Sequence, residues 1–186
     1  MTKIKSLCVY CGSSSGIGEH YVKNAEILGR LMAEAGIALV YGGGTSGIMG
    51  TIARAVKKHG GRVIGIIPNF LLKKEAPDED SGLFDEFIIT QTMHQRKQIM
   101  FERSDAFLAF PGGIGTLEEI VEIMTWAQLD RHKKTIAFAN INGFWKPLIA
   151  LLDHMKNEGF IHRDDKLKPL VIDKVDEILT ALSKQG

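Results

Sequence analysis

Short apolar runs rich in β-branched residues alternate along the chain with longer segments in which apolar residues recur every three to four positions. The short runs predict strands, and the longer segments predict amphipathic helices. Strands are expected at residues 6–10, 37–41, 62–67, 86–90, 106–110, 135–140 and 169–172. Helices are expected at residues 19–35, 48–59, 93–103, 116–129, 145–157 and 175–183. The polar segment 68–83 is expected to be a loop or a short irregular helix.

The predicted strands are apolar throughout instead of alternating between apolar and polar positions. Such strands are typical of a parallel sheet that helices cover on both faces. The alternation of strands and helices therefore predicts an α/β fold: a single-domain, doubly wound, Rossmann-like parallel sheet flanked by helices. No linker, internal repeat or low-complexity segment interrupts the pattern, so residues 1–186 are expected to form one domain. In this architecture ligands bind at the carboxyl ends of the strands, near the point where the strand order reverses.

Composition and charge narrow the class of partner. Of the 186 residues, 45% are apolar and 24% are charged, as in soluble globular proteins. Lys and Arg number 23 and Asp and Glu number 22, which gives a net charge of +1 and no electrostatic case for a nucleic-acid or membrane partner. The chain has no run of about 18 apolar residues and no secretory signal, and its two cysteines suit a reducing compartment. A cytoplasmic protein is therefore expected.

Glycine is unevenly distributed along the chain. Eleven of the 20 glycines fall in three loops, each after a predicted strand: CGSSSGIG (11–18), YGGGTSGIMG (41–50) and PGGIGTLEE (111–119). Glycine permits positive φ angles and lets a ligand approach the backbone closely. The three loops therefore predict a binding surface built from main-chain amides.

The first two loops carry residues suited to a phosphate without matching a known nucleotide motif. Three serines, among them Ser13 and Ser14, add hydroxyl groups just before a helix, although a flexible turn with a serine N-cap accounts for them equally well. The second loop lacks the Lys-Ser/Thr of a Walker A loop, its spacing departs from the dinucleotide fingerprint, and no acid ends the next strand to hold an NAD ribose. A phosphate contact is predicted there, with the candidates Gly43, Gly44, Thr45 and Gly47.

The third loop turns sharply into a helix, whose N-terminal amides form an anion site. Glu118 and Glu119 fall in its first turn, where acids favour the helix dipole, or where a carboxylate beside a bound phosphate acts on the sugar. Adjacent helical residues point about 100° apart, so only one of the two can face the cleft. MHQRK (93–97) opens another helix at the same edge, and Arg96 can form a planar fork to phosphate or carboxylate. A solvated helix face is the alternative interpretation of Arg96 and Lys97.

Redox, metal and serine-nucleophile chemistry have weaker support. Cys8 and Cys11 span a strand end, whereas a thioredoxin-like pair opens a helix. The six histidines have no metal-ligand spacing, and no G-x-S-x-G nucleophile elbow is present. No metal site is expected.

The motifs GGGTSGIMG, MHQRK and PGGIGTLEE, together with CGSSSG, IP (67–68) and MTWAQL, resemble the LOG ("lonely guy") family along nearly the whole chain. Members of this family are cytokinin-activating phosphoribohydrolases that are often labelled lysine decarboxylases. The resemblance implies that Arg96 and Glu119 are the catalytic pair. It also implies substrate contacts at Glu75, Lys97, Gly113, Ile114, Gly115, Thr116, Leu117, Glu118 and Thr125.

The activity implied by the resemblance is hydrolysis of the N-glycosidic bond of a nucleoside 5′-monophosphate, AMP or an N6-modified AMP, to the free base and ribose 5-phosphate. A homodimer is implied, and a metal or organic cofactor is not. Two alternatives stay open. A nucleotide-binding module without turnover would keep the glycine loops for binding alone. A pyridoxal-phosphate lysine decarboxylase would need a Schiff-base lysine, and no lysine stands in or beside the three loops.

Overall fold

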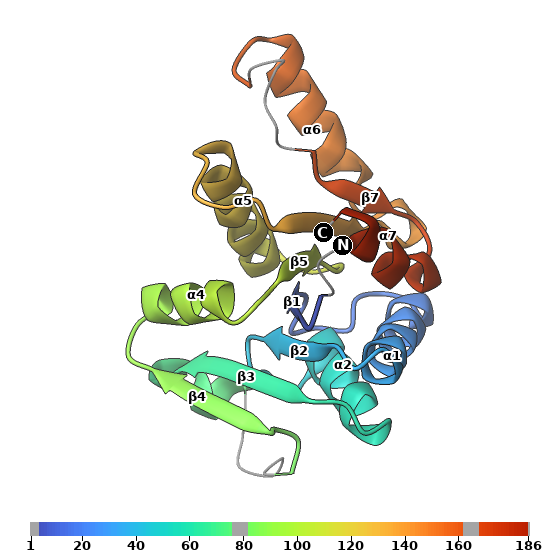
Figure 1. The fold of residues 1–186 in the computed structure, drawn as a ribbon, viewed down its shortest axis with the longest axis vertical. Coiled ribbons are helices and arrows are strands. Elements are labelled where there is room, and N and C mark those ends of the chain that lie inside the picture. The colour runs from blue at the N-terminus through green and yellow to red at the C-terminus, as the bar shows by residue number, and fades with distance from the viewer. Residues whose placement is uncertain (1–3, 76–81, 162–167, 186) are drawn as a thin grey trace.

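Seven strands form one sheet in the computed structural model, which describes residues 4–75, 82–161 and 168–185 (Figure 1). The strands are β1 (Ser6–Tyr10), β2 (Ala38–Tyr41), β3 (Val63–Pro68), β4 (Glu86–Thr90), β5 (Ala106–Ala109), β6 (Thr135–Ala139) and β7 (Leu170–Ile172). The helices of the described residues are α1 (Glu19–Glu34), α2 (Gly47–Lys58), α3 (Leu72–Glu75), α4 (Met93–Glu102), α5 (Ile114–Gln128), α6 (Lys146–Asn157) and α7 (Ile178–Gln185).

The strand order is β4-β3-β2-β1-β5-β6-β7, and every neighbouring pair is parallel. The chain builds outward from β1 to β4 and then returns to place β5 on the other side of β1. The order therefore reverses between β1 and β5, which is where such sheets bind ligands. The three glycine loops follow β2, β1 and β5, which are neighbours in the sheet, so they share one edge at this point. The predicted doubly wound parallel fold is confirmed.

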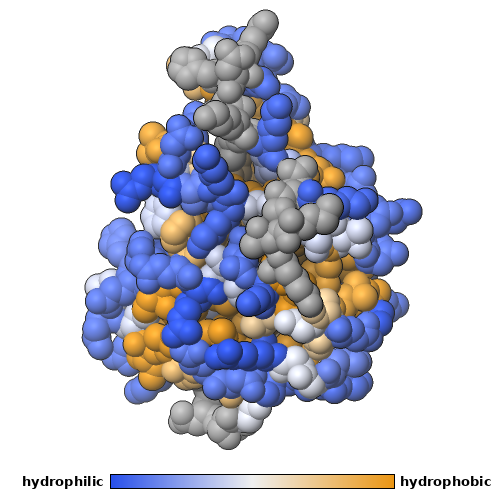
Figure 2. All heavy atoms as spheres, in the orientation of Figure 1, coloured by the Kyte–Doolittle hydropathy of each residue, from blue (hydrophilic) through white to orange (hydrophobic). Residues whose placement is uncertain are grey.

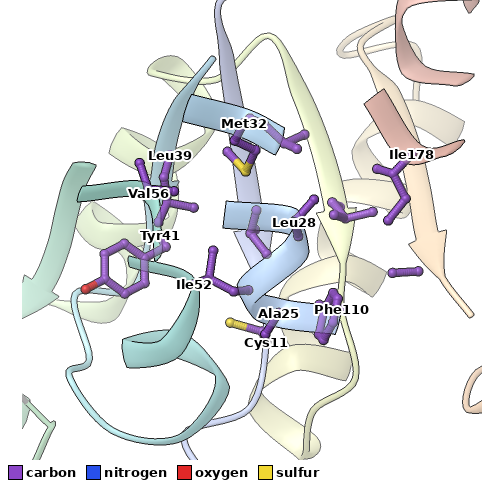
Figure 3. Close-up of a cluster of buried hydrophobic side chains, with 14 of the residues drawn as sticks. Cys11, Ala25, Leu28, Met32, Leu39, Tyr41, Ile52, Val56, Phe110 and Ile178 are labelled. Atoms are coloured by element: carbon purple, nitrogen blue, oxygen red, sulfur yellow. The ribbon is translucent and has the colours of Figure 1, made fainter. Parts of the chain in front are cut away.

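Helices α1, α2 and α7 cover one face of the sheet. Leu28 and Met32 of α1 are fully buried against the sheet and α2. Figure 3 shows them near Ile52 and Val56 of α2. The two helices approach closely because Gly29 has no side chain: a Cβ there would lie 2.6 Å from that of Ala55. This packing fixes the position of α2 relative to β1 and β2, whose glycine loops then meet.

Helices α4 and α5 cover the other face, together with the first turns of α6. Met100 of α4, Ile120 of α5 and Phe107 of β5 belong to a second buried cluster on this side. Helix α6 has no buried residue in its 12 positions and extends away from the sheet in Figure 1. Because α4 follows β4 and α5 follows β5 in this parallel sheet, their N-terminal turns lie at the carboxyl ends of the strands, the edge that carries the glycine loops.

Most element boundaries agree closely with the sequence prediction, and the differences lie at the edge of the sheet and in short turns. Strand β4 alternates between half-buried and exposed residues, because it is an edge strand with Phe87 and Ile89 on an open side. Apolar side chains remain visible in Figure 2 over the part of the molecule where β3 and β4 lie. Segment 68–83, expected to be a loop or a short irregular helix, contains a 3-10 turn (Asn69–Leu71) and the short helix α3, and its residues 76–81 lie outside the described ones. A 3-10 turn (Val175–Glu177) precedes α7, where one continuous helix was expected.

Candidate active site

Arg96 and Glu119 face each other at the edge where the glycine loops meet. A capping box between Thr92 and Gln95 starts α4, and the first turns of this helix place Arg96 inside the protein. Its Nη2 atom lies 3.9 Å from Oε1 of Glu119 and donates a hydrogen bond to the carbonyl oxygen of Gly42 at 3.3 Å. The side chains are only 7% and 12% exposed. The structure therefore joins the second loop, α4 and α5 around one buried pair of opposite charges.

The Arg96 guanidinium has hydrogen-bonding capacity left over. Among the described residues, its buried Nε atom has no hydrogen-bond partner, and Nη1 contacts only the sulfur atom of Met93, at 3.5 Å. A guanidinium carries five N–H groups, and leaving buried donors unpaired costs free energy. An anionic or hydroxyl-bearing ligand would satisfy these donors. The contacts of Met93 and the Gly42 carbonyl are features that sequence reasoning missed, because no pattern in the chain marks them.

Glu119 has an unusual proton affinity. Burial raises its pKa to about 7 from an ordinary value of 4.5, and this effect outweighs the attraction of Arg96. Glu118 and Glu75 raise the pKa further, while Lys97 lowers it. A carboxyl group whose pKa is near neutrality can both take and give a proton under physiological conditions, which is the property of a general acid–base residue.

Glu118 points to a different partner from Glu119, as expected for adjacent helical residues. Lys97 donates hydrogen bonds to Oε1 of Glu118 at 2.6 Å and to Oε2 of Glu122 at 2.9 Å. Burial lowers the pKa of Lys97, but the two carboxylates outweigh this effect and raise it. Glu122 was missed at the level of the sequence, although its position four residues after Glu118 is the spacing at which two helical side chains share a face. In this structure Lys97 and Glu118 bind each other.

The N-terminus of α5 opens onto a cavity of about 200 Å³. The N-cap residue of α5 is Gly113, so no side chain caps the helix by a hydrogen bond. Ile114 and Gly115 in the first turn are exposed. Gly112 is needed for a close turn, since a Cβ there would lie 2.1 Å from Oγ1 of the buried Thr116. The cavity is lined by Gly112 and Gly113, by Ser13, Ser14 and Ser15 of the first loop, and by Tyr21 and Phe144. A helix N-terminus with hydroxyl groups beside it suits an anion such as phosphate.

The N-terminus of α2 differs, because its first amides already have partners. Ile48 donates its backbone N–H to the carbonyl of Ser14 at 3.4 Å, and Met49 donates to that of Gly12 at 3.2 Å. Gly47 has a φ angle of 59° and packs against Ser13, where a Cβ would lie 2.3 Å from the carbonyl oxygen. The first and second loops therefore hold each other in place, and these two amides are not free to bind phosphate.

The second loop also contacts the end of α3. The backbone N–H and the hydroxyl of Thr45 both donate to the carbonyl oxygen of Glu75, at 2.7 and 3.3 Å. Arg54 donates to the carbonyl of Thr45 at 2.8 Å. Glu75 is thereby brought near enough to Glu119 to affect its pKa. Next to this loop, a Cβ on Gly43 would lie 3.2 Å from the ring of Phe87.

Thr125 lies apart from this group. It is exposed, and its hydroxyl donates to the carbonyl of Val121 at 2.8 Å. It follows Glu119 by six residues, which at about 100° per residue places it on a different side of α5. The geometry does not bring Thr125 to the Arg96–Glu119 pair of its own chain.

The two cysteines and the described side chains that can ligate a metal were the other candidates for chemistry. Cys8 and Cys11 are free and buried, and they pack in clusters on opposite faces of the sheet, so they do not form a redox pair. In the described ranges, no group of three or more His, Cys, Asp or Glu side chains is placed to hold a metal ion. Within the same ranges, each helix is too short or too polar to cross a membrane.

Comparison with known proteins identifies close relatives. A family model described as "Possible lysine decarboxylase" matches residues 49–182. The rice protein "Cytokinin riboside 5'-monophosphate phosphoribohydrolase LOG" is 44% identical over 163 residues, 88% of this chain and 66% of that protein. LOGL5 of rice, named a probable enzyme of the same kind, is 45% identical over 86% of this chain and 64% of its own length. LOG7 of Arabidopsis thaliana is 45% identical over 86% and 72% of the two chains. The chain thus spans about two thirds of the length of these relatives.

Solved structures with the same fold are more distant in sequence. The molybdenum cofactor carrier protein of Chlamydomonas reinhardtii superposes with a TM-score of 0.73 at 22% identity, covering 97% of this chain and 96% of the other. The molybdenum cofactor binding protein of Rippkaea orientalis gives a TM-score of 0.71 at 23% identity, over 99% and 98%. At this level of identity the likeness concerns the fold alone.

Proposed function

This chain belongs to the LOG family, and we propose that it hydrolyses the N-glycosidic bond of nucleoside 5′-monophosphates to the free base and ribose 5-phosphate. AMP and N6-modified AMP, the cytokinin riboside 5′-monophosphates for which its relatives are named, are the proposed substrates. The observation that carries the proposal is the buried Arg96–Glu119 pair, which lies between the glycine loops and holds a carboxyl group with a pKa of about 7.

The proposed mechanism assigns a role to the N-terminus of α5 and to Glu119. The 5′-phosphate binds at the N-terminus of α5, in the cavity bordered by Ser13 and Ser14. This contact places C1′ of the ribose beside Glu119. As the bond from C1′ to the base nitrogen breaks, positive charge develops on the sugar, and the carboxylate stabilises it. Glu119 then takes a proton from the attacking water, whose oxygen bonds to C1′, and passes it on to the departing base, which leaves with the electron pair of the broken bond.

Arg96 holds the other components in position. Its Nη2 already bonds to Gly42, and its unpaired Nε and loosely bound Nη1 can donate to a ribose hydroxyl or to the carboxylate of Glu119. Because the guanidinium is planar, such contacts fix the direction as well as the distance of the bound groups. Arg96 therefore orients Glu119 and the sugar.

The two alternative functions account less well for this site. A Schiff-base lysine needs a neutral amine, whereas Lys97 is held protonated by two carboxylates, which raise its pKa. A module that only binds a nucleotide has no use for a buried carboxyl group whose charged form is disfavoured, since such a group costs stability. Absorbance of the purified protein near the visible edge would reveal bound pyridoxal phosphate and contradict the hydrolase.

The direct test is a panel of nucleoside monophosphates assayed by chromatography for release of the base. We expect AMP or an N6-modified AMP to yield base and ribose 5-phosphate in equal amounts, and release by Glu119→Gln to be slower by at least about a hundredfold. Glu19→Gln is a matched control, because Glu19 is an exposed acid on α1. Tight binding of these nucleotides by the wild-type protein without any base release would identify a binding module.

A homodimer is the proposed working form. Val121 of α5 and Leu129 at its C-cap are exposed, and a groove of about 500 Å³ between α4 and α5 is lined in part by His94 and Trp126. Thr125 lies on the same exposed side of α5 and would there reach the partner subunit. Sedimentation equilibrium should give twice the chain mass for the wild-type protein and the single mass for Val121→Glu.

We place this enzyme in the cytoplasm, where its two free, buried cysteines stay reduced.

A further inference from the structure

Two adjacent residues of α4 face two adjacent residues of α5. Arg96 lies opposite Glu119 at 3.9 Å, and Lys97 is hydrogen-bonded to Glu118 at 2.6 Å. Lys97 also bonds to Glu122, one turn further along α5, at 2.9 Å. The lysine side chain is only 10% exposed, so it is held inside the protein with both carboxylates.

Apolar contacts join α4 and α5 where the ring of Phe101 lies 5.1 Å from that of Trp126, but beside Lys97 the two helices are separated by a groove. The groove of about 500 Å³ between the two helices is bordered by Lys97 and Glu122 themselves, together with Trp126. A charge-assisted hydrogen bond at 2.6–2.9 Å constrains direction and distance more than a loose apolar contact does. The two bonds of Lys97 therefore span the groove and connect the helices that carry Arg96 and Glu119.

We infer that Lys97 is a positioning residue, which acts with Glu118 and Glu122 as a clamp that sets the separation of Arg96 and Glu119. This inference rests on the proposed function, because it assigns a role in that reaction. It differs from the role implied by family resemblance, in which Lys97 and Glu118 contact the substrate directly. Lys97 has little capacity left for a substrate, because two of the three donors of its ammonium group are occupied.

The clamp also sets the charge around Glu119. The groups that act on this carboxyl are Arg96 and Lys97 from α4, Glu118 from its own helix and Glu75 from α3. Glu119 also interacts electrostatically with three buried groups of β1 and the adjoining loop, Cys8, Tyr10 and Cys11. Burial raises the pKa values of these groups and keeps them neutral. Removing Lys97 takes away a positive charge and leaves Glu118 unpaired, and both changes raise the pKa of Glu119. Removing the charge of Glu118 lowers it.

The first experiment is a mutant cycle measured by steady-state kinetics. Lys97→Met keeps the length of the side chain, and we expect kcat to fall by at least about tenfold while KM changes less than about threefold. In a protein that already carries Glu118→Gln and Glu122→Gln, adding Lys97→Met should cost less than about threefold, because its partners are gone. Lys97→Arg, which keeps both ion pairs, should retain most of the activity. Lys23→Met is the control, since Lys23 forms an exposed pair with Glu19 on α1.

A direct contact of Lys97 with substrate predicts different results. The loss from Lys97→Met would then appear mainly in KM and would be equally large in the background without Glu118 and Glu122. Either result overturns the clamp. Circular dichroism and thermal melting of each variant establish that it is folded before its kinetics are compared.

The second experiment separates this inference from the proposed function. The pKa of the Glu119 carboxyl is measured by NMR with carbon-13-labelled glutamate, using Glu119→Gln to assign the signal. We expect Lys97→Met to raise this pKa and Glu118→Gln to lower it, whether or not the protein turns over a nucleotide. No shift, or shifts in the other direction, would overturn the clamp. If the wild-type protein released no base while both shifts appeared, the proposed function would fail and the role of Lys97 in holding Glu119 would stand.

Discussion

Arg96 and Glu119 are separated by 3.9 Å, which is longer than a hydrogen bond. A fully formed ion pair would keep the pKa of the carboxyl low, whereas here burial has the larger effect and raises the pKa to about 7. At the scale of single residues, the site therefore combines an exchangeable proton with a fixed cation.

Replacing Glu119 by Gln tests the role of the negative charge. The amide has the same size but can neither stabilise the developing charge on the sugar nor take a proton, so kcat should fall by at least about a hundredfold. Nucleotide binding should persist, because the phosphate binds at the N-terminus of α5. Glu118→Gln, which changes the half-exposed neighbour, is expected to lose less. If Glu118→Gln were the inactive variant and Glu119→Gln kept its turnover, the assignment of the catalytic carboxylate would be wrong.

Replacing Arg96 tests whether its planar shape matters. Arg96→Lys keeps the positive charge but loses the parallel donors that reach Gly42 and the neighbouring ligand space. We expect this variant to be nearly as inactive as Arg96→Ala in the base-release assay. Activity of Arg96→Lys close to that of the wild-type protein would reduce Arg96 to a general source of positive charge.

The pH dependence of turnover should report the ionisation of Glu119. If the carboxylate is the active form, kcat/KM rises with pH and levels off above an apparent pKa of about 7. Measurements of kcat/KM for AMP from pH 5 to pH 9 in buffers of constant ionic strength would define this limb. The residual activity of Glu119→Gln should lack it. A limb that persisted in Glu119→Gln would belong to another group.

At the scale of elements, helices α2 and α5 both begin at glycine loops on the same edge of the sheet, but their first amides have different partners. The first amides of α2 bond to the carbonyls of Ser14 and Gly12, which ties the first two loops together. Helix α5 begins at Gly113 without a side-chain cap and faces the cavity beside the serines. Of these two helix N-termini, α5 is therefore the one that we assign to the substrate phosphate.

The assignment predicts that the 5′-phosphate is required for efficient cleavage. Adenosine lacks the dianion, and the loss of several charge-assisted hydrogen bonds at roughly 1.5–3 kcal/mol each gives a discrimination of about a thousandfold or more. Part of the loss should appear in kcat, because the phosphate contact also positions C1′. Comparison of kcat/KM for AMP and adenosine under the same conditions provides the measurement. A ratio within about tenfold would mean that α5 binds some other group.

The pattern of apolar residues predicted the elements well because strands covered on both faces, such as β1 and β5, leave a continuous apolar run in the chain. For β4 it predicted the bounds correctly but not the exposure of alternate residues, since an edge strand is open on one side. The motifs predicted Arg96 and Glu119, which the structure places face to face. The bonds between Lys97 and Glu122 depend on how two helices are placed across a groove, and no local pattern records that placement.

At the scale of the whole molecule, the topology explains why distant segments meet. Strands β2, β1 and β5 are neighbours, so the loops after them converge although they span residues 11–119 of the sequence. Helices α4 and α5 pack on the same face of the sheet and place Arg96 and Glu119 at this edge. Assembling the site in this way buries a carboxyl group, and this burial lowers the free energy of unfolding when the group is charged.

That cost should be measurable as a dependence of stability on pH. Glu119 has a pKa of about 7 in the folded protein, above its ordinary value of 4.5, so between these values the folded state binds a proton that the unfolded state has released. Its contribution to stability is therefore complete below about pH 4.5 and is lost as the pH rises through about 7. At about 1.4 kcal/mol per pKa unit, the loss amounts to up to about 3 kcal/mol.

Glu119→Gln removes this dependence of stability on pH. Its melting temperature relative to wild type should thus increase from pH 5 to pH 8, whereas Glu19→Gln on the exposed surface of α1 should show no such trend. A constant difference between Glu119→Gln and wild type across this range would mean that Glu119 is charged when buried, and its role as a proton acceptor near neutral pH would have to be abandoned.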